Sequence, residues 1–123
     1  MRLLQRLLGM TEKKPPVHVD DDSFEREVLK SELPVLLDVW GPSCGPCKQL
    51  EPIIMDLAAH YAGRVKVCEL SAVGSPRTTA ALRVQATPTV LYFQGGVELE
   101  RIHGFRASLF HKQTIEELFG IPA

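Results

Sequence analysis

The stretch VLLDVWGPSCGPCKQLEP, from Val35 to Pro52, joins an apolar run to two cysteines, Cys44 and Cys47. The run from Val35 to Trp40 is almost continuously apolar, which predicts a strand buried on both faces. After the cysteines, apolar residues recur at helical spacing, so we expect a long helix there. The cysteines therefore lie where a central strand ends and a helix begins, which is where open α/β sheets place their sites. The apolar positions of this helix are Leu50, Ile54, Leu57 and Tyr61.

The start of a helix favours the ionised form of a cysteine thiol. Backbone N–H groups there lack partners and the helix dipole is positive, so the pKa of Cys44 should fall below the ~8.5 of a free cysteine. Cys47 lies three residues on, near enough for a disulfide. Pro46 suits the first turn, and Gly45 leaves the backbone open to a partner. We expect Cys47 to be the more buried thiol, which resolves a mixed disulfide formed on Cys44.

Two other uses of the cysteine pair are open but less favoured. The pair is half of a zinc knuckle, and His60 and Cys68 nominally complete a set of four ligands. However, Cys68 falls in a predicted buried strand and His60 several turns along the helix, so we expect no metal. A purely structural disulfide is also disfavoured, because a two-residue spacer restrains little of the unfolded chain. We interpret Cys68 as a small core residue.

Asp38 is the single charged residue inside the apolar run. Desolvation in such a strand should raise the pKa of its carboxyl. A buried carboxyl behind a dithiol can take the proton from Cys47 and return it later, and we favour this acid–base role. The alternative is a carboxylate that reaches solvent or pairs with a neighbouring group.

The rest of the chain alternates strands with helices before it ends in a hairpin and a helix. Asp22 should cap an early helix, with Glu25 completing a capping box. The alternating part demands parallel strands with helical crossovers and the hairpin is antiparallel, which gives a mixed sheet with helices on both faces. We predict strands at Val17–Val19, Val65–Leu70, Thr89–Phe93 and Glu98–His103, a short helix opened by Pro76, and a closing helix marked by Ile115, Leu118 and Phe119.

Composition narrows the class of protein. A chain of 123 residues with 45% hydrophobic and 24% charged residues suits one globular domain. The formal net charge of −1 and the lack of a basic stripe argue against a nucleic-acid partner. No apolar run reaches the roughly eighteen residues of a membrane span, so we expect no integral membrane association. Three cysteines are too few for a disulfide-stapled secreted scaffold.

We interpret residues 1–16 as an extension and linker, and residues 17–123 as the domain. The opening MRLLQRLLGM begins like a signal peptide, but Arg6 interrupts its apolar part and no cleavage site follows. We therefore expect a retained segment and a cytoplasmic protein. Leu3, Leu4, Leu7 and Leu8 share one helical face, which favours a short helix packed on the domain or a neighbouring chain over a surface anchor or a frayed end.

Pro88 precedes a predicted strand, and its peptide bond has two readings. A trans bond that merely opens the strand is the commoner case. A cis bond would instead expose backbone beside the cysteines, where a substrate strand could pair with it.

Three stretches in order, LDVWGPSCGPCKQLEPI, ATPTVLYFQGG and HGF, resemble the thioredoxin family. The resemblance covers about Val17 to Phe119. It implies the thioredoxin fold, an α/β arrangement with a central mixed sheet of about five strands and about four helices, here with an N-terminal helical extension. It also implies a cis bond before Pro88 and the reduction of protein disulfides.

The resemblance also assigns roles to residues. It implies that Cys44 is the nucleophile, Cys47 the resolving thiol and Asp38 the buried acid. It implies disulfide-containing protein substrates, electrons from a thioredoxin reductase and no bound cofactor, and we expect a monomer. The alternative is a thioredoxin-like binding module or complex subunit that docks through the N-terminal segment. The substrate-facing residues would be Trp40, Gly45, Pro46, Thr87, Pro88 and Gly104.

Two departures from the family pattern bear on partner choice and redox properties. Ser43 stands where a tryptophan is typical, which removes a large apolar contact from the rim of the site. Glu69 stands where a lysine is typical near the buried acid. If Glu69 faces Asp38, two carboxyls replace an ion pair, one pKa rises and the pair titrates jointly. The alternative is that Glu69 turns to solvent.

Overall fold

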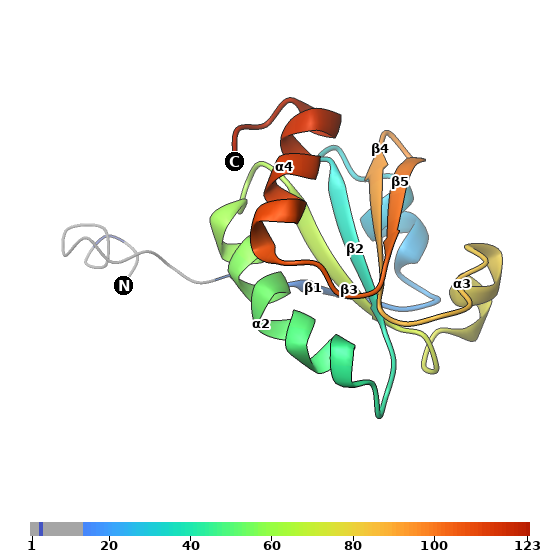
Figure 1. Ribbon diagram of the computed structural model, residues 1–123. Helices are drawn as coiled ribbons and strands as arrows, with labels where there is room; N and C mark the ends of the chain where they lie inside the picture. The colour runs from blue at the N-terminus through green and yellow to red at the C-terminus, as the bar shows by residue number, and fades with distance from the viewer. Residues whose placement is uncertain (1–2, 4–13) are drawn as a thin grey trace.

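The computed structural model describes Leu3 and residues 14–123 (Figure 1). Its centre is one five-stranded sheet with the strand order β1-β3-β2-β4-β5. Strands β1, β3 and β2 run parallel, whereas β4 is antiparallel to β2 and to β5. The mixed sheet expected from the sequence is therefore confirmed. The strands are β1 (Val17–Val19), β2 (Val35–Trp40), β3 (Lys66–Ser71), β4 (Thr89–Gln94) and β5 (Val97–His103).

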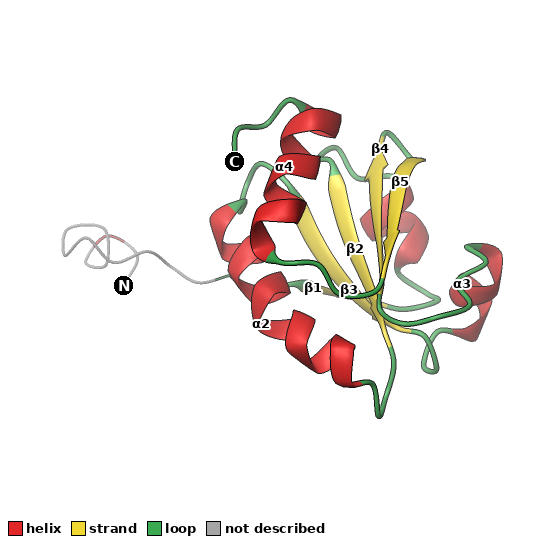
Figure 2. Ribbon diagram, viewed as in Figure 1, coloured by secondary structure: helices red, strands yellow, loops and turns green. Residues whose placement is uncertain are grey.

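Helices cover both faces of the sheet (Figure 2). Helices α2 (Gly45–His60) and α4 (Ser108–Phe119) lie on one face, while the π-helix η1 (Glu25–Leu29) and α3 (Pro76–Ala81) lie on the other. Each face has its own apolar core, and β2 contributes to both, with Leu36 in the core beneath α2 and Leu37 in the opposite core. This two-sided burial is what the apolar run predicted.

The predicted cap of the first helix is wrong. Asp20, not Asp22, holds the turn that precedes η1: its Oδ1 accepts hydrogen bonds from the backbone N–H groups of Asp22 (2.9 Å) and Ser23 (3.0 Å). The Ser23 hydroxyl in turn accepts from the Asp20 N–H at 3.0 Å. The reciprocal pair therefore forms two residues earlier than the sequence pattern indicated.

Most of the predicted N-terminal extension lies outside the described residues. The short helix predicted within residues 1–10 cannot be compared with the structure, which describes only Leu3 of that segment, so it stays a prediction. Within the described part of the chain, no helix combines the length and apolarity needed to cross a membrane.

Candidate active site

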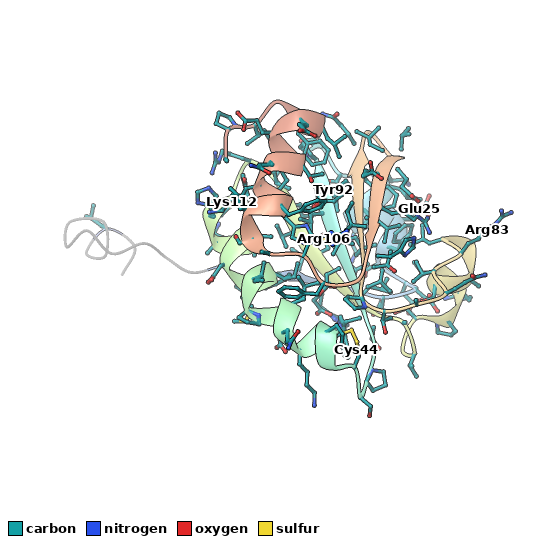
Figure 3. The ribbon with its side chains drawn as sticks, in the orientation of Figure 1. Glu25, Cys44, Arg83, Tyr92, Arg106 and Lys112 are labelled. Carbon is teal, nitrogen blue, oxygen red and sulfur yellow. A yellow bond between two sulfur atoms is a disulfide. The ribbon has the colours of Figure 1, made fainter. Side chains whose placement is uncertain are left out.

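Cys44 and Cys47 form a disulfide at the start of α2, directly after β2 (Figure 3). Their Cα atoms lie 5.2 Å apart. Cys44 is the N-cap of α2, and its sulfur accepts a hydrogen bond from the backbone N–H of Cys47 at 3.2 Å. Cys44 is half-buried, whereas Cys47 is only 7% exposed. The structure thus has the expected asymmetry, with one sulfur open to a partner and the other covered.

The loop before β4 lies against the first cysteine. The Thr87–Pro88 peptide bond is cis, as the resemblance implied and as the residues alone left open. The carbonyl oxygen of Thr87 lies 3.6 Å from the Cys44 Sγ. The Gly104 N–H donates to the Pro88 carbonyl at 2.9 Å, which ties the end of β5 to this loop. Thr87, Pro88 and Gly104, far apart from Cys44 in sequence, are therefore brought to one side of the disulfide.

The Asp38 carboxyl is buried behind the disulfide, at only 5% exposure. Its Oδ1 has no hydrogen-bond partner among the described residues. Burial raises the pKa of Asp38 to about 7, with a further contribution from the nearby carboxylates of Glu69 and Glu51. Asp38 and Cys47 line the same cleft, of about 500 Å³, so the buried carboxyl and the second cysteine face one shared space.

Glu69 faces the same side of the sheet as Asp38, because the two residues are register partners on adjacent parallel strands. It also holds two neighbours. Its Oε1 accepts from the indole N–H of Trp40 at 2.7 Å, and its Oε2 accepts from Nδ1 of His18 at 2.8 Å. The alternative in which Glu69 turns to solvent is wrong, since its side chain is only 25% exposed.

Ser43 stands at the exposed rim of the cleft with a positive φ of 53°. This left-handed conformation costs a non-glycine residue on the order of 1 kcal/mol, so surrounding structure must hold it in place. No bulky side chain at this position covers the cleft. The cleft wall is formed by apolar, polar and charged residues from four segments: Pro15, Pro16, Asp38, Trp40, Gly41, Pro42, Ser43, Cys47, Lys48, Glu51, Ile54, Met55 and Glu69.

Sequence reasoning missed two residues of the site. Glu51 follows Cys47 by four residues, and this helical spacing is a signal that would have placed it on the same face of α2. His18 gave no such signal, because it reaches Glu69 across 51 residues of sequence. Substitution at either position is therefore informative about the surroundings of the buried acid.

The zinc arrangement is not present in the part of the chain that the structure describes, where no group of three or more His, Cys, Asp and Glu side chains is placed to hold a metal ion. Cys68 is fully buried in β3, as a core residue should be. Burial raises the pKa of its thiol to about 12, which leaves it unreactive at neutral pH.

Fold and site together define a class: a protein that exchanges disulfides through two cysteines at the amino end of a helix, opposite a cis-proline loop. The Thioredoxin family profile matches residues 15–117. The chain belongs to the thioredoxin family, and it is a thiol–disulfide oxidoreductase.

Individual relatives agree with this assignment. The chain is 40% identical over 99 residues to the thioredoxin of Synechocystis sp., covering 80% of this chain and 92% of that protein. It is 48% identical over 75 residues to the thioredoxin of Thiocapsa roseopersicina, covering 61% and 82%. It is also 42% identical over 86 residues to a chloroplastic M-type thioredoxin of Pisum sativum, covering 70% and 50%.

Proposed function

We propose that this protein reduces disulfides of other proteins, with Cys44 as the nucleophile and Cys47 as the resolving thiol. The observation that carries the proposal is that Cys44, half-buried at the N-terminus of α2, is more accessible than Cys47, which is buried beside it. The helix dipole and the Cys47 N–H both favour a thiolate on Cys44 in the reduced protein.

The reaction proceeds through two exchanges of S–S bonds. The Cys44 thiolate attacks one sulfur of the substrate disulfide, forms a mixed disulfide and releases the first substrate thiolate, which takes up a proton. The Cys47 thiolate then attacks the Cys44 sulfur, breaks the mixed disulfide and forms the Cys44–Cys47 disulfide. The second substrate thiolate is released and takes up a proton in turn. The substrate gains two electrons and two protons, and the dithiol loses them.

Asp38 supplies acid–base catalysis in the second exchange. Its pKa of about 7 lets the carboxylate accept the proton of the Cys47 thiol near neutral pH. The shared cleft provides the space through which that proton travels. We expect Trp40, Gly45, Pro46, Thr87, Pro88 and Gly104 to form the surface against which the substrate lies.

Members of the thioredoxin family act on disulfide substrates with a thioredoxin reductase and without a prosthetic cofactor. We propose that a thioredoxin reductase, drawing two electrons from NADPH, also restores the Cys44–Cys47 dithiol of this chain. A monomeric state, a cytoplasmic location and the lack of any metal or cofactor are further parts of the proposal. They rest on the sequence alone.

The test is insulin reduction with dithiothreitol, followed by turnover with purified thioredoxin reductase and NADPH. Wild type should accelerate insulin reduction, and Cys44→Ser should fall to the uncatalysed rate. Cys68→Ser is the matched control and should keep full activity, since that thiol is buried away from the site. The Cys47→Ser variant should accumulate a mixed disulfide that mass spectrometry detects. Equal rates for wild type and Cys44→Ser would overturn the proposal.

The alternative role as a binding module that docks through residues 1–10 gains no support from the family assignment. It rests on a segment outside the described residues, apart from Leu3. Deletion of residues 1–10, followed by measurement of oligomer size and membrane association, tests it directly.

A further inference from the structure

A row of three titratable side chains crosses three neighbouring strands on the α2 face of the sheet. Glu69 is the register partner of His18 on β1 and of Asp38 on β2. Residues paired in register on parallel strands point to the same face, so the three side chains stand side by side. Trp40 follows Asp38 by two residues along β2 and therefore points to that face as well.

Glu69 is connected by hydrogen bonds to both Trp40 and His18. Its two carboxylate oxygens are both used, one by the Trp40 indole N–H and one by His18 Nδ1. The Glu69 side chain is 25% exposed and that of His18 is 65% exposed, so the bond to Trp40 lies on the more protected side. A hydrogen bond to a charged acceptor in a partly buried place is among the stronger ones in proteins.

Trp40 lies half-buried in the wall of the cleft, beside Pro42 and Ser43. With only a serine at position 43, the indole is the one large aromatic surface in the lining of this cleft. An indole ring has a single N–H donor, so the bond to Glu69 uses its whole hydrogen-bonding capacity and restrains the rotation of the ring.

We propose that Glu69 is a positioning residue for Trp40: it fixes the indole plane at the rim of the active site and thereby shapes the surface offered to protein substrates. His18 on the edge strand is the second anchor, holding the carboxylate in place. This inference rests on the proposed function, because it assumes that the substrate polypeptide lies across the rim.

Two substitutions separate the hydrogen bond from the carboxylate charge. Glu69→Gln removes the charge but keeps an oxygen at the same reach, so the amide can still accept from the indole N–H. Glu69→Thr suits a strand but is too short to reach the indole. Glu69→Val also removes the hydrogen bond to the indole, with an apolar side chain, and replaces Glu69→Thr in the experiment if that variant does not fold. His18→Ala removes only the second anchor.

The first readout uses Trp40 itself, which is the only tryptophan of the chain. Time-resolved fluorescence anisotropy of the oxidised protein reports the motion of this one ring. Wild type and Glu69→Gln should show a rigid indole. Glu69→Thr and Glu69→Val should show a fast depolarising component, and His18→Ala a smaller one. An indole as rigid in Glu69→Thr and Glu69→Val as in wild type would overturn the proposal, and so would a mobile indole in Glu69→Gln.

The second readout compares a large and a small substrate with each variant. Loss of the Glu69 carboxylate also changes the electrostatics at Asp38, so Glu69→Thr is compared with Glu69→Gln, which loses the same charge. The KM for insulin should be roughly threefold to tenfold higher in Glu69→Thr than in Glu69→Gln, with similar kcat, because binding is lost rather than chemistry. Reduction of a small aromatic disulfide, which touches little of the rim, should differ by no more than about twofold between these two variants. A lower kcat in Glu69→Thr than in Glu69→Gln on both substrates, with equal KM, would overturn the role at the rim.

The two readouts keep this inference distinct from the proposed function. If wild type fails to reduce insulin, the proposed function fails, whereas the anisotropy still decides whether Glu69 anchors Trp40. If wild type is active and the indole stays rigid without the acceptor, the inference fails and the proposed function stands.

Discussion

The stability of Asp38→Asn relative to wild type should increase as the pH rises from 4 to 8, although the substitution removes a group of the active site. In the folded protein the pKa of this carboxyl is raised from 3.8 to about 7 by burial first and by Glu69 and Glu51 second. Below pH 3.8 the carboxyl is protonated in both the folded and the unfolded chain, so its ionisation costs nothing. As the pH rises toward 7, the unfolded chain ionises first and the folded state loses stability relative to it.

The size of the effect follows from the gap between the two pKa values. The gap is about three pH units, and each corresponds to about 1.4 kcal/mol, so wild type should lose ~4 kcal/mol of unfolding free energy between pH 4 and pH 8 through this group. Asp38→Asn lacks this loss. Its stability relative to wild type should therefore increase by a similar amount over that range.

Urea unfolding of the oxidised protein at pH 4, 6 and 8 measures this difference. The comparison of pH values matters more than either value alone, because a buried amide with an unpaired group has a cost of its own that does not depend on pH. Asp56→Asn, on the exposed side of α2, is the matched control and should track wild type. If the difference between Asp38→Asn and wild type is the same at all three pH values, the reasoning is refuted.

Three further predictions concern parts of the molecule away from the dithiol. Burial lowers the pKa of His111 from 6.5 to about 4, so the unfolded chain binds the proton more tightly than the folded protein does. Wild type should therefore lose ~3 kcal/mol of unfolding free energy as the pH falls from 6.5 to 4. Urea titrations over this pH range should show that His111→Gln lacks this loss. In the reduced native protein, iodoacetamide should label Cys44 first, and mass spectrometry should find Cys68 modified only after denaturation. A modified Cys68 in the native protein would contradict its burial. Gly96→Ala places a Cβ 2.9 Å from the Leu29 carbonyl oxygen, whereas a Cβ at Gly63, which has a similarly positive φ, meets no atom within 4 Å. Thermal unfolding should therefore show that Gly96→Ala is less stable than Gly63→Ala by about 1–3 kcal/mol. Equal unfolding midpoints for the two variants would contradict the clash.

Local patterns predicted the frame of the site because they reflect local physics. The apolar run from Val35 to Trp40 required burial on both sides, and the helical spacing after Cys47 required a helix there. The isomer of the bond before Pro88 did not follow from the residues, because both isomers suit a proline that opens a strand. That bond was predicted only through the resemblance.

The hydrogen bonds of Glu69 with Trp40 and His18 could not be predicted from the sequence, for a different reason. They depend on the register of three strands. In the sequence, Glu69 lies 29 positions from Trp40 and 51 positions from His18. The family pattern placed Glu69 near Asp38, but no pattern in one sequence shows which donors a carboxylate will find. The wrong cap at Asp22 has the same origin, since Asp20 offers the same side chain two residues earlier.

The position of Cys44 as the N-cap of α2 links the oxidation state of the protein to the end of a helix. In the reduced form a thiolate, a charged acceptor, faces the Cys47 N–H, whereas in a mixed disulfide the same sulfur is neutral and accepts more weakly. We expect this hydrogen bond to be weaker in the mixed disulfide than in the reduced protein, at the step in which Cys47 attacks Cys44. Serine is a favoured N-cap residue, so Cys44→Ser removes the nucleophile and leaves the turn capped, while Cys44→Ala removes both.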